Sequence, residues 1–276
     1  MKVLSIDLDY VFDAVDDWPN EDNEMWDNWH PYSKWYFYFC KYSDIDKREN
    51  IVNEDNLDYL IETFVNALNA NPNAKVCFGL DHDNILLDLE GDNIELVNID
   101  HHDDFLAGSN VDGDKSDQMS EEEYLGGHIL EYALIKAFNK VDEGNWGAKL
   151  HCDGRLKKMT WIRNPVHKLQ DTRHFVNQFI CNYMGNEPTE WVTTVREEYD
   201  HGNYEYDHIF ICLSPKYLPY SQWDLLSLFM GIYEQNTGKD SAIEEWWDRR
   251  YIDKSQYKQV YEIAKEALSD FKENLT

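Results

Sequence analysis

The sequence predicts an α/β fold in which helices flank a mostly parallel central β-sheet. Along the first half of the chain, apolar segments and helical segments follow one another in the order strand, helix, strand, strand, helix. This order is typical of α/β proteins. The apolar segments also end abruptly in acidic residues and histidines. Buried strands of such a sheet open at their carboxyl ends into the crevice where ligands bind.

The elements of the first half are the more regular ones. Strands are predicted at 2–6, 74–80 and 94–99, and a helix at 122–138 with Ala133, Leu134 and Ala137 on its apolar face. A further helix precedes the second strand, where Asn53 or Asp55 can cap it and an Asn-Pro-Asn segment at 71–73 can end it. Its apolar residues have the spacing of one helix face: Leu57, Leu60, Ile61, Phe64, Val65 and Leu68.

The second half contains fewer clear patterns. Strands are predicted at 159–162, 191–195 and 207–213, and helices at 223–233 and 254–271. Residues 13–34 form an acidic, tryptophan-rich segment, for which we expect an active-site loop or lid. The alternative is a surface loop held in place by its tryptophans. We found no repeat or linker, so one domain is predicted to span residues 1–276.

Composition restricts the partners of this protein. The chain has 54 acidic residues against 25 Lys and Arg, a net charge of −29. Such a charge argues against nucleic acid and favours a cationic partner, bound metals or simply high solubility. The five cysteines form no CxxC pair, and Cys77 and Cys212 lie in apolar strands as small hydrophobic residues. The cysteine pattern favours a reducing compartment. Because the sequence also has no recognisable signal peptide or membrane span, we expect a cytoplasmic protein.

The most informative segment is 94–105, an apolar strand that runs into Asp-His-His-Asp-Asp. Asp100, His102 and Asp104 alternate, so in an extended backbone their side chains would converge on one point. So many ionisable groups at a buried strand end are costly unless a cation gathers them. Asp7 and Asp9 follow the first strand, and His82 follows the second.

These residues predict a pair of divalent metal ions. Carboxylates with some imidazole suit a hard or borderline ion such as Mn²⁺, whereas a structural Zn²⁺ site would normally contain thiolates. Four carboxylates and two histidines are too many for one ion and suit two. Two ions a few Å apart lower the pKa of a shared water towards neutrality. The predicted chemistry is metal-assisted hydrolysis.

Several segments resemble the arginase (ureohydrolase) superfamily. The Asp-x-His-x-Asp run at 100–104 resembles one signature of that superfamily, the Ser-Ile-Asp-Leu-Asp run at 5–9 another, and 80–83 its segment with a metal-binding histidine. Together with 144–146 and 213–215, these segments look more specifically like an atypical arginase-like family. Some of its members are peptide arginases, which convert arginine to ornithine in ribosomally made precursor peptides. The resemblance covers about residues 1–165 and 207–220.

The resemblance implies an arginase-like three-layer α/β/α fold and a role for each matching residue. Two Mn²⁺ ions would be held by Asp7, Asp9, His82, Asp100, His102 and Asp104. Asp7 and Asp100 would bridge the ions, and Asp104 would also hydrogen-bond the attacking hydroxide. His128, after Gly126-Gly127, would pass a proton to the leaving amine, the alternative being a capping or packing histidine.

The implied reaction is attack of hydroxide on the guanidinium carbon of an arginine in a precursor peptide, followed by release of urea. A carboxylate must receive the guanidinium group in bidentate fashion. The sequence leaves four aspartates open for this role: Asp13, Asp16, Asp83 and Asp103.

Two features depart from ordinary arginases. The Asp-x-Asp segment precedes the Asp-x-His-x-Asp segment here, whereas in ordinary arginases it follows, so the strand order of the sheet is open to permutation. In addition, His101 stands beside His102, and the alternation of side chains favours His102 as the ligand.

Three alternatives remain open at this point. Asp100-His101-His102 also matches the signature of DHH phosphoesterases, which are two-metal hydrolases. The C-terminal Gly-rich basic domain of that family is missing here, and the charge of the chain would repel phosphates. A one-zinc deacetylase of the arginase-like fold is the second alternative. The third is a non-catalytic acidic binding protein, whose carboxylates would spread over exposed helix faces rather than follow apolar strands.

Overall fold

Seven strands form one sheet in the computed structural model, which describes residues 1–11, 52–106, 121–165, 168–185, 187–215, 218 and 222–244. The strand order is β5-β4-β3-β1-β6-β2-β7, and every pairing is parallel. This confirms the α/β class and the parallel sheet. The strands are β1 (Lys2–Asp7), β2 (Lys75–Gly79), β3 (Ile94–Asp100), β4 (Leu156–Arg163), β5 (Glu190–Thr194), β6 (His208–Cys212) and β7 (Ile243–Glu244).

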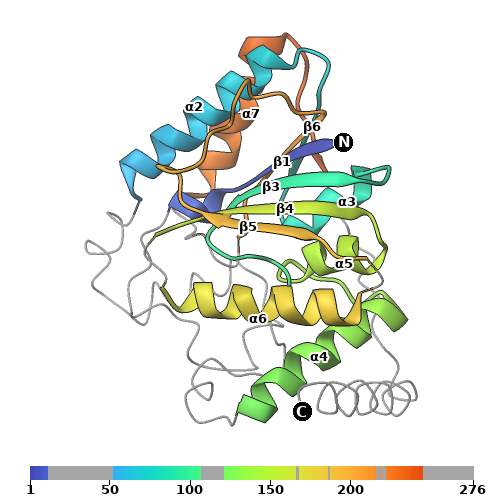
Figure 1. Ribbon diagram of the computed structural model, residues 1–276. Coiled ribbons are helices and arrows are strands. Elements are labelled where there is room, and N and C mark those ends of the chain that lie inside the picture. The colour runs from blue at the N-terminus through green and yellow to red at the C-terminus, as the bar shows by residue number, and fades with distance from the viewer. Residues whose placement is uncertain are drawn as a thin grey trace, which may run out of the picture.

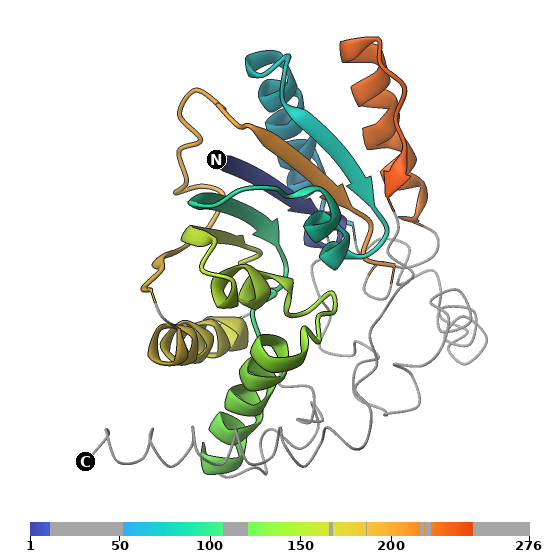
Figure 2. The same ribbon diagram turned by 90° about the vertical axis from the view of Figure 1, so that its right-hand side faces the viewer.

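Helices cover both faces of the sheet, so the described chain has three layers (Figures 1 and 2). On one face lie α2 (Glu54–Ala70) and α7 (Asp224–Thr237). On the other lie α4 (Glu121–Phe138), α5 (Trp146–Cys152) and α6 (Lys168–Met184). Three short helices complete the set: η1 (Leu8–Val11), η4 (His82–Asn84) and α3 (Ile85–Asp88).

The two faces have separate hydrophobic cores because side chains alternate along each strand. Leu4 and Ile6 of β1 pack into the core beneath α2 and α7, whereas Val3 packs into the core beneath α4, α5 and α6. Helix α2 begins as its sequence predicts, since the Asn53 side chain accepts a hydrogen bond from the Asn56 amide (3.1 Å). Burying both faces explains why the strands read as continuous apolar runs.

Most predicted elements are present within the described residues. Helices α5 and α6 and strand β7 were not anticipated, and Ala137 is exposed rather than on the buried face of α4. The predicted loop at 13–34 and helix at 254–271 lie outside the described residues. Within the described part of the chain, no helix has both the length and the apolar character needed to cross a membrane.

The topology of the sheet changes direction at the carboxyl ends of β1 and β3. These two strands are neighbours, with Ile6 paired to Ile99. The chain leaves β1 through α2 on one face and leaves β3 through α4 and α5 on the other. Neighbouring parallel strands whose connections leave on opposite faces form the topological switch point where α/β proteins bind ligands. Both acidic segments therefore lie at this switch point, whichever of them comes first in the chain.

Candidate metal centre

Three neighbouring strands end in residues that can bind a metal. β1 ends at Asp7, β3 at Asp100 and β6 at Cys212, and Asp7 is the register partner of Cys212. Cys212 faces the core under α4, α5 and α6. Val3 and Leu96 face the same core, and each stands an even number of residues before Asp7 or Asp100 on its strand. The three side chains therefore project from the same face at the same edge of the sheet.

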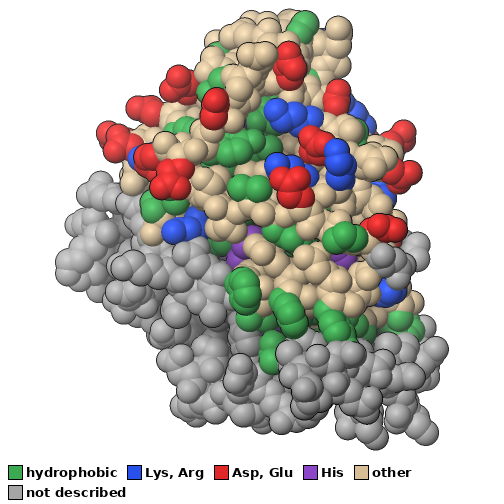
Figure 3. All heavy atoms as spheres, in the orientation of Figure 1, with side chains coloured by type: hydrophobic (Ala, Val, Ile, Leu, Met, Phe, Trp, Pro, Cys, Tyr) green, Lys and Arg blue, Asp and Glu red, His purple; other side chains and the backbone are tan. Residues whose placement is uncertain are grey.

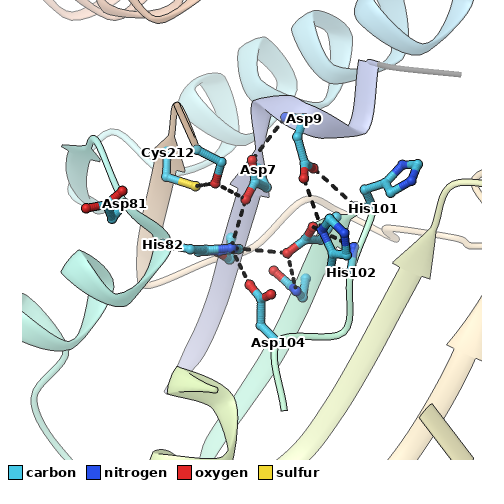
Figure 4. Close-up of polar contacts among 12 residues, drawn as sticks. Asp7, Asp9, Asp81, His82, His101, His102, Asp104 and Cys212 are labelled. Atoms are coloured by element: carbon cyan, nitrogen blue, oxygen red, sulfur yellow. Dashed lines mark hydrogen bonds and ion pairs between the residues drawn. The ribbon is translucent and has the colours of Figure 1, made fainter. Parts of the chain in front are cut away.

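The first group of potential ligands surrounds one ring nitrogen of His82. Its Nδ1 atom lies 3.1 Å from Asp7 Oδ2, 3.1 Å from Asp100 Oδ2 and 2.6 Å from Asp104 Oδ2. All four residues are buried, and their ligand atoms lie within 4.8 Å of one another. Figure 4 shows Asp7, His82 and Asp104 pointing towards one another from β1 and from the segments after β2 and β3.

The second group contains Asp9, Asp100 and His102. His102 Nδ1 lies 3.1 Å from Asp9 Oδ2 and 4.0 Å from Asp100 Oδ1. Asp100 thus directs one oxygen to each group, and the two groups share this carboxylate. Asp7 does not belong to the second group, and its Oδ1 accepts a hydrogen bond from the Asp9 amide (3.0 Å). Asp100 is therefore better placed than Asp7 to bridge two ions.

The geometry around His82 fits a cation. Ser5 Oγ lies 2.6 Å from His82 Nε2, so it can accept the Nε2 proton and leave the Nδ1 lone pair facing the carboxylates. Nδ1 is buried and makes no hydrogen bond of acceptable geometry despite its three carboxylate neighbours. A lone pair surrounded by carboxylate oxygens is repulsive unless a proton or a metal cation lies among them. Although burial opposes it, the surrounding negative groups raise the pKa of His82 well above its usual value, so a cation of either kind is favoured there. The donor set therefore fits a divalent metal.

Further hydrogen bonds hold the carboxylates in place. The Trp146 indole donates to Asp104 Oδ2 (2.7 Å), and the Asn98 side chain donates to Asp100 Oδ2 (3.1 Å). The Ser214 hydroxyl donates to Asp7 Oδ2. Such outer contacts orient metal ligands and are a regular part of metal sites. Trp146 reaches Asp104 because the next residue, Gly147, packs against the Asp104–Phe105 backbone and ring where a Cβ atom has no room.

The charges of the two groups are strongly coupled. Burial and the Asp7 and Asp100 carboxylates raise the pKa of Asp9 to about 8. Burial and the Asp100 charge raise the pKa of Asp104 well above its usual value. Burial acts against ionisation of His102, but hydrogen bonding and charge from Asp9 raise its pKa to about 10. Protons and metal cations therefore compete for the same buried negative charge.

The Asp-x-His-x-Asp side chains meet for a different reason from the one predicted. The strand ends at Asp100, the chain bends at His101 and His102, and Asp104 has a left-handed backbone (φ 53°). The expectation of an extended 100–104 segment was therefore wrong, because a tight turn replaces the strand there. The turn directs His102 towards Asp9, while His101 lies beside it and points away from the aspartates (Figure 4).

The remaining predicted site residues lie elsewhere or are committed to other contacts. His128 is buried on α4 and belongs to neither group of potential ligands among the described residues. Asp103 accepts hydrogen bonds from His174 (2.8 Å) and Asn177 (2.9 Å), which commits it to α6 rather than to a guanidinium group. Asp83 is buried in η4, and Asp13 and Asp16 lie outside the described residues.

Sequence reasoning overlooked Cys212 and Ser5 as members of this centre. The Sγ atom of Cys212 lies within 4.8 Å of ligand atoms of Asp7 and His82, and all three residues are buried. Cys212 was interpreted as a small hydrophobic core residue. The signal that could have found it is its place at the carboxyl end of a buried strand, the same signal that identified Asp7 and Asp100.

A cavity of about 510 Å³ lies one strand away from the centre, at the carboxyl ends of β4 and β5. Arg163, which lines it, is the register partner of Asp100. His174, also in its wall, hydrogen-bonds Asp103 in the turn that carries the ligands. The rest of the lining consists of Phe175, Gln178, Trp191, Thr193, Thr194, Val195 and Glu198. No protein-family model, curated protein or solved structure matches the chain.

Proposed function

We propose that this protein is a binuclear metal hydrolase that converts arginine side chains of a peptide to ornithine and releases urea. The observation that supports it most is the pair of ligand groups that share Asp100, which are buried except for the partly exposed His102. Divalent ions a few Å apart with a common carboxylate are the usual arrangement for activating a water in hydrolysis. The resemblance of the 5–9 and 100–104 segments to arginases selects the guanidinium group as the substrate.

The ligand types suit two Mn²⁺ ions. His82, Asp7 and Asp104 would hold the first ion, Asp9 and His102 the second, and Asp100 would bind both. Carboxylate and imidazole ligands suit Mn²⁺. When bound, the ions supply a water of lowered pKa, which provides hydroxide near neutral pH.

Side chains around the centre would orient the attacking water and transfer a proton to the leaving group. The Trp146 indole holds Asp104, whose carboxylate would accept a hydrogen bond from the attacking water and align it with the guanidinium carbon. Burial of the aspartates keeps bulk water away from the reacting groups. His128 would give a proton to the departing ornithine nitrogen. The adjoining cavity has the volume of small-molecule sites and leaves room for peptide groups next to the arginine.

The charge distribution favours an enzyme over a mere acidic binding surface. A protein that neutralises a basic partner needs its carboxylates exposed. Here four aspartates are buried together at strand ends: Asp7, Asp9, Asp100 and Asp104. The large negative charge of the whole chain would in addition attract a cationic arginine peptide.

The decisive experiment incubates the Mn²⁺-loaded protein with an arginine-containing peptide and with free arginine. We expect urea and a loss of about 42 Da per converted arginine in the peptide. Asp100→Asn should lower urea formation by more than the roughly 10- to 100-fold that loss of an outer-sphere partner costs. Asp92→Asn, at an exposed turn before β3, is the matched control and should leave the rate unchanged.

Other outcomes would redirect the assignment. Hydrolysis of a phosphodiester, with every arginine substrate unchanged, would indicate the DHH phosphoesterase alternative. A protein that purifies without stoichiometric metal and binds a basic partner equally well as Asp100→Asn would be a non-catalytic acidic binder.

A further inference from the structure

Cys212 occupies a position that a simple core residue would not need. It ends β6 directly opposite Asp7, and its Sγ atom lies 3.4 Å from the hydroxyl of Ser214, which itself donates to Asp7. Asp7, His82 and Cys212 form a third group of ligand atoms within 4.8 Å of one another, and all three are buried. The thiol therefore lies next to Asp7 and His82, whereas Asp100 and Asp104 belong with these two residues to a separate group.

The second observation is the direction of His82. Its buried Nδ1 atom makes no hydrogen bond of acceptable geometry and lies 3.1 Å from Asp7 Oδ2. His82 and Asp7 are also grouped with Cys212 (Figure 4). Other described thiols are placed differently. Cys77 on β2 donates to Asp88 (3.1 Å), and Cys181 is buried within the core under α6. Among the described cysteines, Cys212 is thus the one grouped with potential metal ligands.

We propose that Cys212 is a thiolate ligand and makes the His82 side of the centre a mixed sulfur, nitrogen and oxygen site. Soft thiolate ligands favour Zn²⁺ or Co²⁺ over Mn²⁺, whereas Asp9, Asp100 and His102 offer only oxygen and nitrogen. The two positions would therefore select different ions. On binding, the thiol releases its proton to solvent and a metal–sulfur bond forms, with no change of oxidation state. This inference rests on the proposed metal centre and refines its metal content.

Cobalt substitution tests the inference without an activity assay. Co²⁺ bound at any site gives visible ligand-field bands, and a Co²⁺–thiolate bond adds a charge-transfer band in the near ultraviolet. We expect wild type to show both kinds of band. Cys212→Ser should lose the charge-transfer band and keep the visible bands. Cys77→Ser, which removes a buried thiol from a nearby strand, should retain both.

Metal affinities give a second measure. Cys212→Ser should weaken Zn²⁺ binding at least about tenfold and leave Mn²⁺ binding within about twofold, because Mn²⁺ gains little from sulfur. Cys212→Ala serves the same purpose if the serine variant fails to fold.

The outcomes separate the two claims. Visible bands without a charge-transfer band in wild type would overturn the role of Cys212 and leave the metal centre standing. A charge-transfer band that persists in Cys212→Ser would also overturn it. Absence of any cobalt spectrum would refute the metal centre itself, and the proposed function with it.

Discussion

At the scale of single residues, Ser5 decides which nitrogen of His82 is available to a cation. Its hydroxyl lies 2.6 Å from Nε2 and leaves Nδ1 for the carboxylate cluster. We predict that Ser5→Ala weakens Mn²⁺ binding by roughly 10- to 100-fold, as loss of other outer-sphere partners does. It should also destabilise the fold by about 1–3 kcal/mol, because a buried N–H loses its acceptor.

Isothermal titration calorimetry with Mn²⁺ and urea unfolding measure the two effects. Ser241→Ala is the control, since that hydroxyl also makes a short hydrogen bond (2.6 Å to Glu234) but lies outside the centre. An unchanged Mn²⁺ affinity in Ser5→Ala would show that Ser5 has no part in orienting His82.

His208 is a second residue whose burial has a measurable consequence. Burial lowers its pKa to about 4, so the folded protein keeps it neutral where the unfolded chain, with a pKa near 6.5, binds a proton. Its stabilising contribution is therefore complete above about pH 6.5 and is lost as the pH falls to about 4. For this one group the loss is up to about 3 kcal/mol.

The measurement compares urea unfolding of wild type and His208→Gln between pH 7.5 and about 4. The stability of wild type relative to the variant should fall as the pH is lowered, because glutamine does not titrate. The overall charge of the chain affects both proteins equally and cancels in the difference. A difference that stays constant with pH would contradict the assignment.

At the scale of elements, α6 has an unusual pattern of polarity, although Ile180 and Cys181 near its end are buried in the core. It buries His174 and Asn177, which both hydrogen-bond Asp103, and it exposes Phe175 (68 %) and Phe179 (42 %). The sequence pattern did not indicate this helix, because a buried polar face and exposed phenylalanines do not resemble an ordinary amphipathic helix. Its polar face anchors the turn that carries His102 and Asp104.

This pattern predicts an inverted order of mutational effects. Asn177→Ala should destabilise the protein by about 1–3 kcal/mol, because the buried Asp103 carboxylate and the Leu106 carbonyl both lose a hydrogen-bond donor. Phe175→Ala should change stability by no more than about 0.5 kcal/mol, as expected for an exposed side chain. Urea unfolding of the two variants tests this, and a larger loss for Phe175→Ala would show that its side chain is covered.

At the scale of the whole molecule, the candidate metal centre brings together distant parts of the chain. Its potential ligands come from β1 and η1, from η4 after β2, and from β3 and the bend that follows it, and Cys212 would add β6. An ion that binds this assembled site and not the unfolded chain must stabilise the fold. On the face shown in Figure 3, acidic side chains are scattered, with Lys and Arg among them. Such exposed acids bind ions far more weakly than a preformed site.

We therefore predict that Mn²⁺ at about 100 times its Kd stabilises the protein by about 2.7 kcal/mol, and that a chelator reverses the effect. The stabilisation should be larger at pH 8 than at pH 6. With the pKa of Asp9 raised to about 8, protons compete with the metal at the lower pH. Thermal unfolding with and without Mn²⁺ tests this, with Asp100→Asn as the variant that should lose the response.

The sequence by itself determined the α/β class, the central strands, helix α2 and the residues that carry the candidate chemistry. These follow from local patterns: apolar strands, helical spacing, and acids and histidines where strands end. The tertiary structure alone decided that β6 lies between β1 and β2, which places Cys212 and Ser214 beside Asp7. It also decided that a bend, rather than an extended strand, turns His102 and Asp104 towards the other ligands. Pairing between segments 200 residues apart leaves no periodic trace in the sequence, because it depends on which strand edges remain free when the sheet assembles.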